Sequence, residues 1–347
     1  MKKALFILLS SLILLTSCNL DGQGIFNDIL SSEAVTNVDV QEFIGVLDNK
    51  IYVNSENGLS YYEMNSSAQN TTLFTPKEKE QYAFYKFVFE SDESDGTKYA
   101  LKSINDPNGF YFEVENMTDH TSTKVTFKAS ENEINKIIGS EVYYVDGKNV
   151  FTAIVKTVGD KYYLINVDDT NHLIYSENEN ENTLTVSNAK EISDYKEDAR
   201  IIGPNAYENN NKYYVDGIEK TIKDGNKNSL TIHFLSSDYA VAGSDYTVYD
   251  SNGKALKNKE EKAIKLSGTP FYTKAGGKTF LISNSALIAD GNKHEVKTLF
   301  SSLSGREKQY IAVEDNNNNS IKIYRVTASN GVYCTTVDLS SNNETQN

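Results

Sequence analysis

The sequence of 347 residues contains no tryptophan, four prolines, three methionines and only two cysteines. Two cysteines cannot build a disulfide-rich scaffold, so we expect a buried core to hold the fold, for which the chain is long enough. Basic residues are also scarce, since 34 lysines and arginines stand against 48 acidic residues and the formal net charge is -14. Such a surface repels phosphate groups, and we therefore expect no nucleic-acid partner.

Recognisable catalytic and metal-binding motifs are absent as well. The sequence has no H-E-x-x-H, no cysteine pair, no G-x-G-x-x-G and no G-x-S-x-G, so it predicts neither a zinc site nor a cofactor. The histidines are scattered: His120, His172, His233 and His294. We interpret His233 as a packed strand residue because it lies in an apolar run. Gly276-Gly277-Lys278-Thr279 resembles the end of a phosphate-binding loop, but Tyr272 stands in place of its first glycine, so a hairpin turn is predicted.

Two loops carry oxygen-bearing side chains at alternate positions, an arrangement that can converge on Ca²⁺. The candidate ligands are Asp224, Asn226 and Asn228 in one loop and Asp315, Asn317 and Asn319 in the other. Each loop offers a single carboxylate, and Leu235 or Val326 stands where an EF-hand has its bidentate glutamate. Asn and Asp also favour turns for backbone reasons alone, which is the alternative interpretation.

No apolar run is long enough to span a bilayer as a helix, which takes about 20 residues. The longest run, Ala4–Leu15, follows Lys2 and Lys3 and fits the apolar core of an export signal. It ends in Leu15-Thr16-Ser17-Cys18, which resembles the lipobox of bacterial lipoproteins. The resemblance implies that residues 1–17 are a signal peptide and that Cys18 is acylated, with palmitate among the expected chains. An ordinary secretory signal with a coincidental cysteine is the alternative.

This resemblance organises the rest of the chain. We expect residues 18–40 to be a lipidated tether, residues 41–338 the folded body, and residues 339–347 a disordered tail. Membrane contact then comes through the lipid on Cys18, with the outer membrane of a bacterial envelope as the expected location. Cys334 would have no partner in the mature chain, and we interpret it as a small buried residue of a strand.

The composition and turn signals of the body predict β-structure. The chain has 23 tyrosines and 15 phenylalanines, residues that favour strands. Asn-Gly and Asp-Gly pairs, which suit two-residue hairpin turns, recur between aromatic or alternating runs. They occur at residues 57–58, 95–96, 108–109, 146–147, 216–217, 224–225, 252–253, 290–291 and 330–331.

The turns recur in longer units of about 40–50 residues. Asn182-Thr183-Leu184-Thr185-Val186 and Asn228-Ser229-Leu230-Thr231-Ile232 lie 46 residues apart, and Phe43-Ile44-Gly45 and Ile137-Ile138-Gly139 lie 94 apart. Ile201-Ile202-Gly203 falls out of step. A period of this length, made of four short strands, is typical of a propeller blade.

The body therefore resembles β-propeller proteins in period and strand pattern, although no blade signature identifies a particular family. We predict an all-β, propeller-like fold of six four-stranded blades, with seven as the other count. Short helical inserts are expected at residues 130–138, 191–199 and 257–266, the first on a capping-box pattern. A pair of β-sandwiches and an irregular solenoid are the competing architectures.

Paired tyrosines place one ring on each face of a strand, and we expect most of them to pack between blades. The pairs are at residues 61–62, 143–144, 162–163 and 213–214. Without a catalytic motif, the sequence favours a non-enzymatic binding or scaffold module, with a protein or glycan docking on the propeller rim. An envelope hydrolase or lyase acting on glycans or peptides is the alternative. Two facing carboxylates beside an arginine in the central cavity would favour the enzyme.

Overall fold

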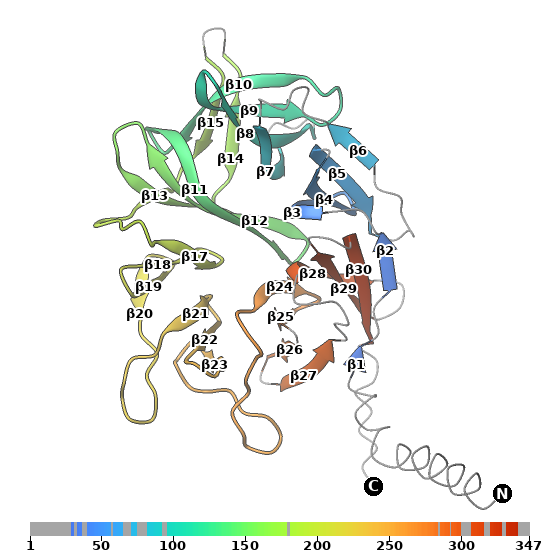
Figure 1. The fold of residues 1–347 in the computed structure, drawn as a ribbon, viewed down its shortest axis with the longest axis vertical. Coiled ribbons are helices and arrows are strands. Elements are labelled where there is room, and N and C mark those ends of the chain that lie inside the picture. The colour runs from blue at the N-terminus through green and yellow to red at the C-terminus, as the bar shows by residue number, and fades with distance from the viewer. Residues whose placement is uncertain are drawn as a thin grey trace, which may run out of the picture.

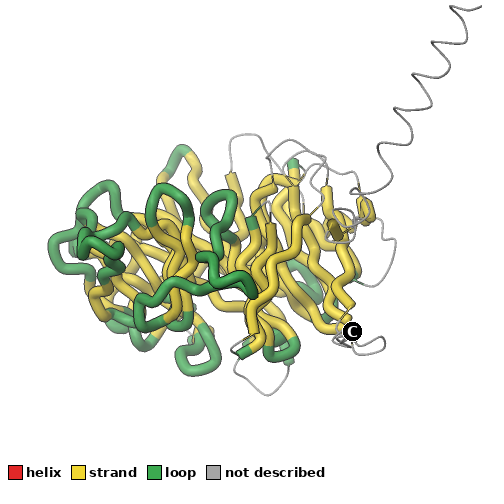
Figure 2. Tube along the Cα trace, turned by 90° about the horizontal axis from the view of Figure 1, so that it is seen from below, coloured by secondary structure: helices red, strands yellow, loops and turns green. Residues whose placement is uncertain are grey.

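The computed structural model describes residues 29–30, 33–36, 40–56, 58–64, 71–74, 82–91, 96–178, 181–283, 285–291, 293–299, 307–315, 320–327 and 331–338. These residues form strands joined by turns and loops, and they contain no helix; hence this part of the chain offers no membrane-spanning helix. Seen face-on, the sheets are arranged around a common centre (Figure 1), and from the side the body is flattened (Figure 2). The all-β, propeller-like prediction is confirmed.

Seven sheet units can be followed around the ring in the described residues, so seven is the observed count. Blade 1 contains β3 (Val40–Leu47), β4 (Lys50–Ser55), β5 (Gly58–Glu63) and β6 (Thr71–Phe74). Blade 2 contains β7 (Tyr82–Glu90), β8 (Lys98–Asp106), β9 (Gly109–Asn116) and β10 (Ser122–Ala129). Blade 3 contains β11 (Asn132–Val145), β12 (Lys148–Thr157), β13 (Tyr162–Val167) and β16 (Lys190–Glu191).

The remaining blades are built in the same way. Blade 4 contains β17 (Arg200–Gly203), β18 (Ala206–Asn209), β19 (Lys212–Val215) and β20 (Ile218–Lys220). Blade 5 contains β21 (Ile232–Leu235), β22 (Tyr239–Ala242) and β23 (Thr247–Asp250). Blade 6 contains β24 (Phe271–Ala275), β25 (Lys278–Ile282), β26 (Ser285–Asp290) and β27 (Lys293–Leu299). Blade 7 contains β28 (Glu307–Asp315), β29 (Ser320–Thr327) and β30 (Gly331–Asp338). An extra hairpin, β14 (Leu173–Ser176) and β15 (Thr183–Val186), pairs with β10.

The N-terminal segment completes the ring. β2 (Glu33–Thr36) pairs antiparallel with β30 and becomes the outermost strand of blade 7. β1 (Ile29–Leu30) pairs in parallel with β27 of blade 6. Residues 18–40 were predicted to be a tether, but these two strands of the segment pair with blades 6 and 7. The signal peptide, Cys18 and the tail 339–347 lie outside the described residues.

Three blades begin with the same local device. Phe43-Ile44-Gly45, Ile137-Ile138-Gly139 and Ile201-Ile202-Gly203 lie on β3, β11 and β17, and each contains a register shift against the next strand. The third copy, out of step in sequence, therefore occupies an equivalent place in the fold. Gly203 has a steric reason, because a Cβ there would lie 1.8 Å from the carbonyl oxygen of Leu235 on β21. Only glycine allows these two neighbouring strands to approach so closely.

Tight turns connect the strands as the sequence predicts. Asp146-Gly147 and Asp216-Gly217 take positive φ at both positions, which matches the twist of a hairpin. Gly276 and Gly277 also have positive φ and form the turn between β24 and β25, so the phosphate-loop resemblance is a hairpin.

The predicted helical inserts are wrong, and local side-chain bonds explain why. Ser130 has φ 53° in the turn between β10 and β11, and its hydroxyl donates to the Ser187 carbonyl instead of capping a helix. Near residue 194, Lys196 donates its N–H to the Asn209 side chain. Asn258 accepts the N–H groups of Glu260 and Lys262 and so closes a hairpin turn.

The tyrosine pairs pack between blades, as predicted. Each pair divides its two rings between separate hydrophobic clusters. Tyr62, Tyr144 and Tyr163 belong to the largest cluster, whereas their neighbours Tyr61, Tyr143 and Tyr162 pack in three other clusters, and Tyr213 and Tyr214 are divided likewise. A strand places successive side chains on opposite faces, so a Tyr-Tyr pair serves both neighbouring interfaces.

The hairpin of β11 and β12 is longer than the others and reaches across the ring (Figure 1). Val145 at its tip pairs with Lys274 of β24, and the N–H of Asp146 donates to the Lys274 carbonyl at 3.1 Å. Asn149 fixes the other side, because its amide bonds to both backbone groups of Val46 in blade 1. β11 therefore lies between two groups of blades, and this position creates the site described next.

Candidate functional site

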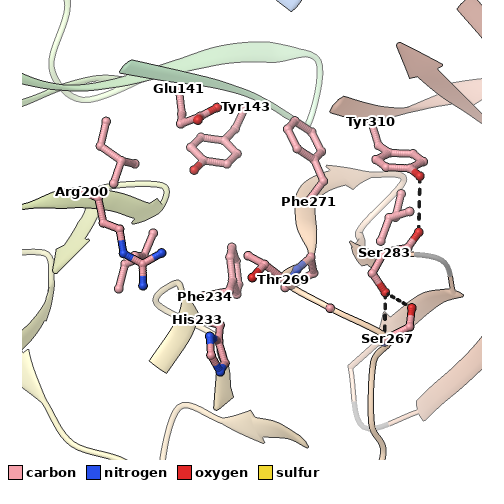
Figure 3. A pocket seen from close by; sticks show the side chains of 15 residues that line it. Glu141, Tyr143, Arg200, His233, Phe234, Ser267, Thr269, Phe271, Ser283 and Tyr310 are labelled. Atoms are coloured by element: carbon pink, nitrogen blue, oxygen red, sulfur yellow. Dashed lines mark hydrogen bonds between the residues drawn. The ribbon is translucent and has the colours of Figure 1, made fainter. Parts of the chain in front are cut away.

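Two cavities lie on either side of β11 at the centre of the ring. The first, which we call the axial cavity, has a volume of about 340 Å³ and is lined mainly by the first strands of blades 3 to 7 (Figure 3). Its walls combine aromatic rings with few ionisable groups. The lining side chains labelled in Figure 3 are Glu141, Tyr143, Arg200, His233, Phe234, Ser267, Thr269, Phe271, Ser283 and Tyr310.

The second cavity, which we call the acidic chamber, has a volume of about 440 Å³. It is lined by residues of blades 1, 2, 3 and 7: Gln41, Glu42, Asn54, Phe84, Glu141 and Gln309. Glu141 belongs to both linings, so the two cavities adjoin at this residue of β11. The centre of the propeller is thus divided in two, with one carboxyl group at the boundary.

Glu141 is the most perturbed carboxyl group of the site. It is partly buried on β11 and has no hydrogen-bond or ion-pair partner among the described residues. Burial and, to a smaller extent, the nearby charge of Glu42 together raise its pKa to about 7. A carboxyl group of this kind is part protonated at neutral pH, so it can donate or accept a hydrogen bond and can exchange a proton.

Glu42 is held in place by an amide. The Nδ2 group of Asn54 donates to Glu42 Oε2 at 2.9 Å and to the Tyr85 carbonyl at 3.1 Å, so it bridges blades 1 and 2. Gln309 of blade 7 accepts the backbone N–H of Phe43, the residue after Glu42. These contacts fix the first strand of blade 1 opposite β11, with the two carboxyl groups close enough to interact electrostatically.

The positively charged and imidazole groups of the axial cavity are already engaged. Arg200 donates through Nε and Nη2 to Glu208 Oε2, at 2.8 and 2.6 Å. The His233 Nε2 atom lies 3.1 Å from the carbonyl oxygen of Gly243, and its ring packs over Tyr246 with centroids 4.5 Å apart. His233 is therefore a packed strand residue, as the sequence predicts, that also borders the cavity.

Aromatic rings form most of the remaining wall. Phe271 lies between Tyr143 and Tyr310, with ring centroids 5.9 and 6.2 Å away. Burial, followed by the charge of Glu141, raises the pKa of Tyr143 well above its ordinary value, so its hydroxyl stays protonated. Ser267 and Ser283 bond to each other through their hydroxyls at 3.0 Å.

The candidate calcium ligands occupy other places. Asp224 Oδ1 accepts the N–H groups of Asn226 and Asn228, and its Oδ2 accepts the Asn228 amide, so the loop bonds to itself. These hydrogen bonds lower the pKa of Asp224. Asp315 ends β28 and pairs with Lys322 at 3.2 Å, whereas Asn317 and Asn319 lie outside the described residues. Among the residues that the structure describes, no three His, Cys, Asp or Glu side chains converge on a metal position.

Glu42, Glu141 and Arg200 were not predicted as site residues, although the sequence carries a signal for them. Glu42 directly precedes Phe43-Ile44-Gly45, and Arg200 directly precedes Ile201-Ile202-Gly203. These tripeptides lie on the first strands of their blades, so a charged residue close to one of them lies near the central axis. Glu141 follows Ile137-Ile138-Gly139 by two residues and lines both central cavities. Cys334, by contrast, is half-buried on β30 against the core, in agreement with its interpretation as a strand residue.

Comparison with known proteins gives distant structural similarities. No protein-family model and no curated protein matches the chain. An ancestral GH74 enzyme is similar over 87% of this chain and 48% of that chain, with a TM-score of 0.46 and 9% identity. PorZ, an essential surface component of the type-IX secretion system of Porphyromonas gingivalis, is similar over 89% of this chain and 39% of that chain, with a TM-score of 0.37 and 9% identity. The chain thus spans less than half the length of either protein, and neither protein's function extends to it.

Proposed function

We propose that the protein is a lipid-anchored binding module of the bacterial cell envelope, which takes a small ligand, or the end of a glycan or peptide, into the axial cavity. The observation that carries this proposal is the cavity itself, about 340 Å³ in volume and walled by Tyr143, Phe234, Phe271 and Tyr310. Aromatic walls with a few well-placed polar groups are typical of ligand sites. The lipid expected on Cys18 supplies the membrane contact that a surface of charge -14 does not.

The arrangement of polar groups favours binding without chemical change. Nucleophilic catalysis needs a hydroxyl or thiol within hydrogen-bond reach of a base. Here His233 bonds to a backbone carbonyl, and the serine hydroxyls at the cavity bond to each other. Arg200 is fixed by Glu208 with its guanidinium at the cavity wall, where it can orient a ligand.

A ligand screen with the full-length chain in detergent tests this function. Arrays of glycans and peptides identify candidate ligands, and calorimetry then measures their affinity for the protein and for Phe271→Ala, which removes one aromatic wall. We expect Phe271→Ala to weaken binding at least tenfold. Phe110→Ala, which removes an exposed ring of blade 2, is the control and should bind like the parent. Unchanged binding by Phe271→Ala would contradict the use of the axial cavity.

A specific observation also supports a second function, that of an envelope hydrolase acting on glycans or peptides. Glu141, with its pKa near 7, and Glu42, which accepts a hydrogen bond from Asn54, are two carboxyl groups whose environments differ. Such pairs divide the roles of general acid and general base. Turnover of a glycosidase or peptidase substrate that is lost in both Glu141→Gln and Glu42→Gln would establish the hydrolase in place of the binding module.

The anchor has its own test. Cys18→Ser should move the protein from the membrane fraction of the bacterial cell to the soluble envelope fraction, because the acylated side chain is removed. Metabolic labelling with a palmitate analogue should mark the parent protein and leave Cys18→Ser unlabelled. Membrane association that survives this substitution would contradict lipid anchoring at this residue.

A further inference from the structure

We propose that the acidic chamber is a second binding site, which holds the ammonium group of an organic amine between Glu42 and Glu141. This site is distinct from the axial cavity of the proposed function, although the two cavities share Glu141 in their linings. The ligand class follows from three features of the chamber: its uncompensated charge, its apolar wall and the small number of oxygen ligands it can offer to a metal.

The charge of the chamber is unbalanced. Glu42 accepts a hydrogen bond from the neutral Asn54 amide, and neither Glu42 nor Glu141 has an ion-pair partner in the described part of the chain. Their mutual repulsion is strong enough to contribute to the raised pKa of Glu141. Two neighbouring carboxylates without a counter-charge attract a cation, and the cation would lie where the repulsion is greatest.

Cationic and titratable groups on the surrounding strands do not supply this counter-charge. Arg200 of β17 is paired with Glu208, and His233 of β21 lies on the far side in the axial cavity. Lys86 of β7 lies 5.6 Å from the Phe84 ring centroid. None of them lowers the pKa of Glu141, whose shift comes from burial and Glu42 alone.

Tyr143 of β11 and Tyr310 of β28 are titratable groups that line the axial cavity together with Glu141. Both are buried phenols, and burial keeps Tyr143 protonated and neutral. β28 contributes the neutral Gln309 to the chamber itself. The negative charge of Glu42 and Glu141 therefore remains for a ligand to neutralise.

The apolar wall and the size of the chamber favour an organic cation over a metal ion. Phe84 lines the chamber, and the Lys86 ammonium group lies over its ring at 5.6 Å from the centroid, so this aromatic wall accommodates an organic cation. Ca²⁺ needs six to eight oxygen ligands. The chamber offers two carboxyl groups and three amides, of which Gln309 already accepts the N–H of Phe43. A volume of about 440 Å³ leaves room for an alkyl chain beside the ammonium group.

Binding of the amine should be coupled to the release of a proton from Glu141. With a pKa near 7, Glu141 carries a proton in about three-quarters of the molecules at pH 6.5. An ammonium group next to Glu141 favours its ionised form, so the proton leaves for the buffer when the amine binds. The affinity for the amine should therefore rise on the order of tenfold per pH unit below pH 7 and level off above it.

Calorimetry with the full-length protein in detergent tests the site directly. The probes are n-butylammonium chloride, the neutral 1-butanol and CaCl₂, each at pH 6.5 and 8.0 in two buffers that differ in ionisation enthalpy. We expect butylammonium to bind at least tenfold more tightly than 1-butanol and to release more than half a proton at pH 6.5. Equal affinity for the two butyl probes would overturn the proposal, as would Ca²⁺ binding that excludes butylammonium.

Three variants with the same chemical change locate the site. Glu141→Gln should abolish proton release and weaken butylammonium binding at least tenfold. Glu42→Gln should also weaken binding and should reduce proton release at pH 6.5. Glu131→Gln, which makes the same change on an exposed turn, should bind like the parent. Phe271→Ala separates the two proposals, because its loss of ligand in the axial cavity should leave butylammonium binding in place.

Discussion

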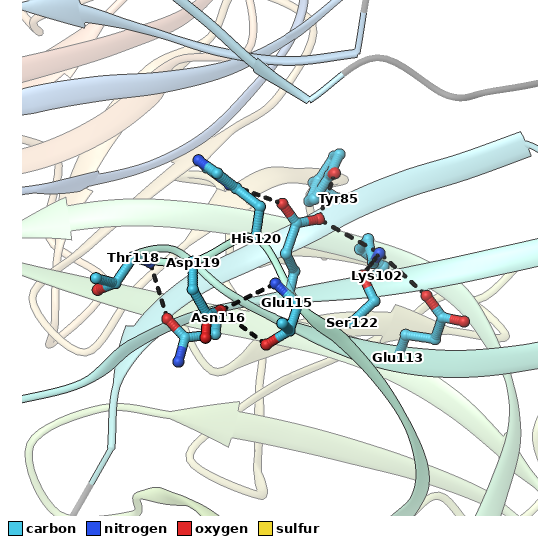
Figure 4. A network of polar contacts seen from close by, with 10 residues as sticks. Tyr85, Lys102, Glu113, Glu115, Asn116, Thr118, Asp119, His120 and Ser122 are labelled. Atoms are coloured by element: carbon cyan, nitrogen blue, oxygen red, sulfur yellow. Dashed lines mark hydrogen bonds and ion pairs between the residues drawn. The ribbon is translucent and has the colours of Figure 1, made fainter.

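Two buried acidic groups in this protein lie in contrasting surroundings. In blade 2, Glu115 is fully buried and accepts hydrogen bonds from Tyr85 at 2.8 Å and from Lys102 at 3.3 Å, and His120 lies 3.3 Å from its other oxygen (Figure 4). Lys102 also pairs with Glu113 at 3.0 Å. Glu141, on the axis of the ring, has no such partner in the described residues.

The contrast separates structural charge from charge that is available for function. A buried carboxylate whose hydrogen-bonding capacity is met by its neighbours has little left to offer a ligand, and its network ties strands together. A buried carboxyl group without partners loses its hydration and gains no hydrogen bond or ion pair in return. A fold that retains such a group therefore suggests a role for it other than stability. By this criterion the network of blade 2 is structural, whereas Glu141 is the carboxyl group on which the proposals above depend.

The largest loss of stability should follow from removing the cation of the blade 2 network. Lys102 is 2% exposed, so Lys102→Met would leave Glu113 and Glu115 without their counter-charge. We expect a loss of about 3–5 kcal/mol in the free energy of unfolding, measured by urea denaturation. Lys128→Met is the control, because its pair with Glu181 is solvent-accessible and should contribute less than about 1 kcal/mol. Similar losses of stability in both variants would show that the buried network of Lys102 contributes no more than a solvent-accessible ion pair.

Substitution of Glu141 should have the opposite effect and raise the free energy of unfolding. Its pKa is higher in the folded protein than in the unfolded chain, so the folded state binds more protons between about pH 4.5 and 7 and loses stability as the pH rises through this range. Glu141→Gln removes this penalty and should be more stable than the parent by up to about 3 kcal/mol at pH 8, with the difference fading towards pH 4.5. Denaturation at pH 5 and 8 measures it. A difference that does not change between these pH values would show that Glu141 ionises normally.

A smaller loss is expected when one hydrogen bond of the blade 2 network is removed. Tyr85→Phe deletes the hydroxyl that donates to Glu115, while Lys102 and His120 remain. We expect a loss of about 1–2 kcal/mol in unfolding free energy, since a buried charged acceptor loses one of its donors. The control is Tyr207→Phe, which leaves the ring stacked on Tyr214 and should change stability by less than about 0.5 kcal/mol.

The β-structure and the hairpin turns could be predicted from sequence because they depend on local chemistry. Asp146-Gly147 adopts the positive φ angles that its residue types favour, and paired tyrosines such as Tyr143-Tyr144 serve two interfaces whatever the partners are. The helical inserts failed for a tertiary reason. Ser130 has a capping pattern, but the Ser187 carbonyl, 57 residues away, takes its hydroxyl hydrogen bond.

The site could not be predicted because its parts meet only in the closed ring. Glu42 and Glu141 are 99 residues apart, and among 48 acidic residues nothing in their own sequence marks a raised pKa. Burial is the larger cause of that shift, and it depends on β11 crossing between the blades. The tripeptides on β3, β11 and β17 are the one local signal for proximity to the axis, and their third copy was out of step in sequence.

The smallest effect tests whether the two axial carboxyl groups act as a pair. Glu42 is the second cause of the raised pKa of Glu141, after burial. Glu42→Gln should therefore lower that pKa by less than about one unit, which corresponds to roughly 1 kcal/mol at most. An NMR titration of the Glu141 side-chain carboxyl carbon in the parent and in Glu42→Gln measures the shift, with Glu131→Gln as the control. If the pKa of Glu141 fell to the ordinary range of glutamate in Glu42→Gln, repulsion by Glu42 rather than burial would be its main cause. Glu141 and Glu115 would then differ only in the charges that surround them.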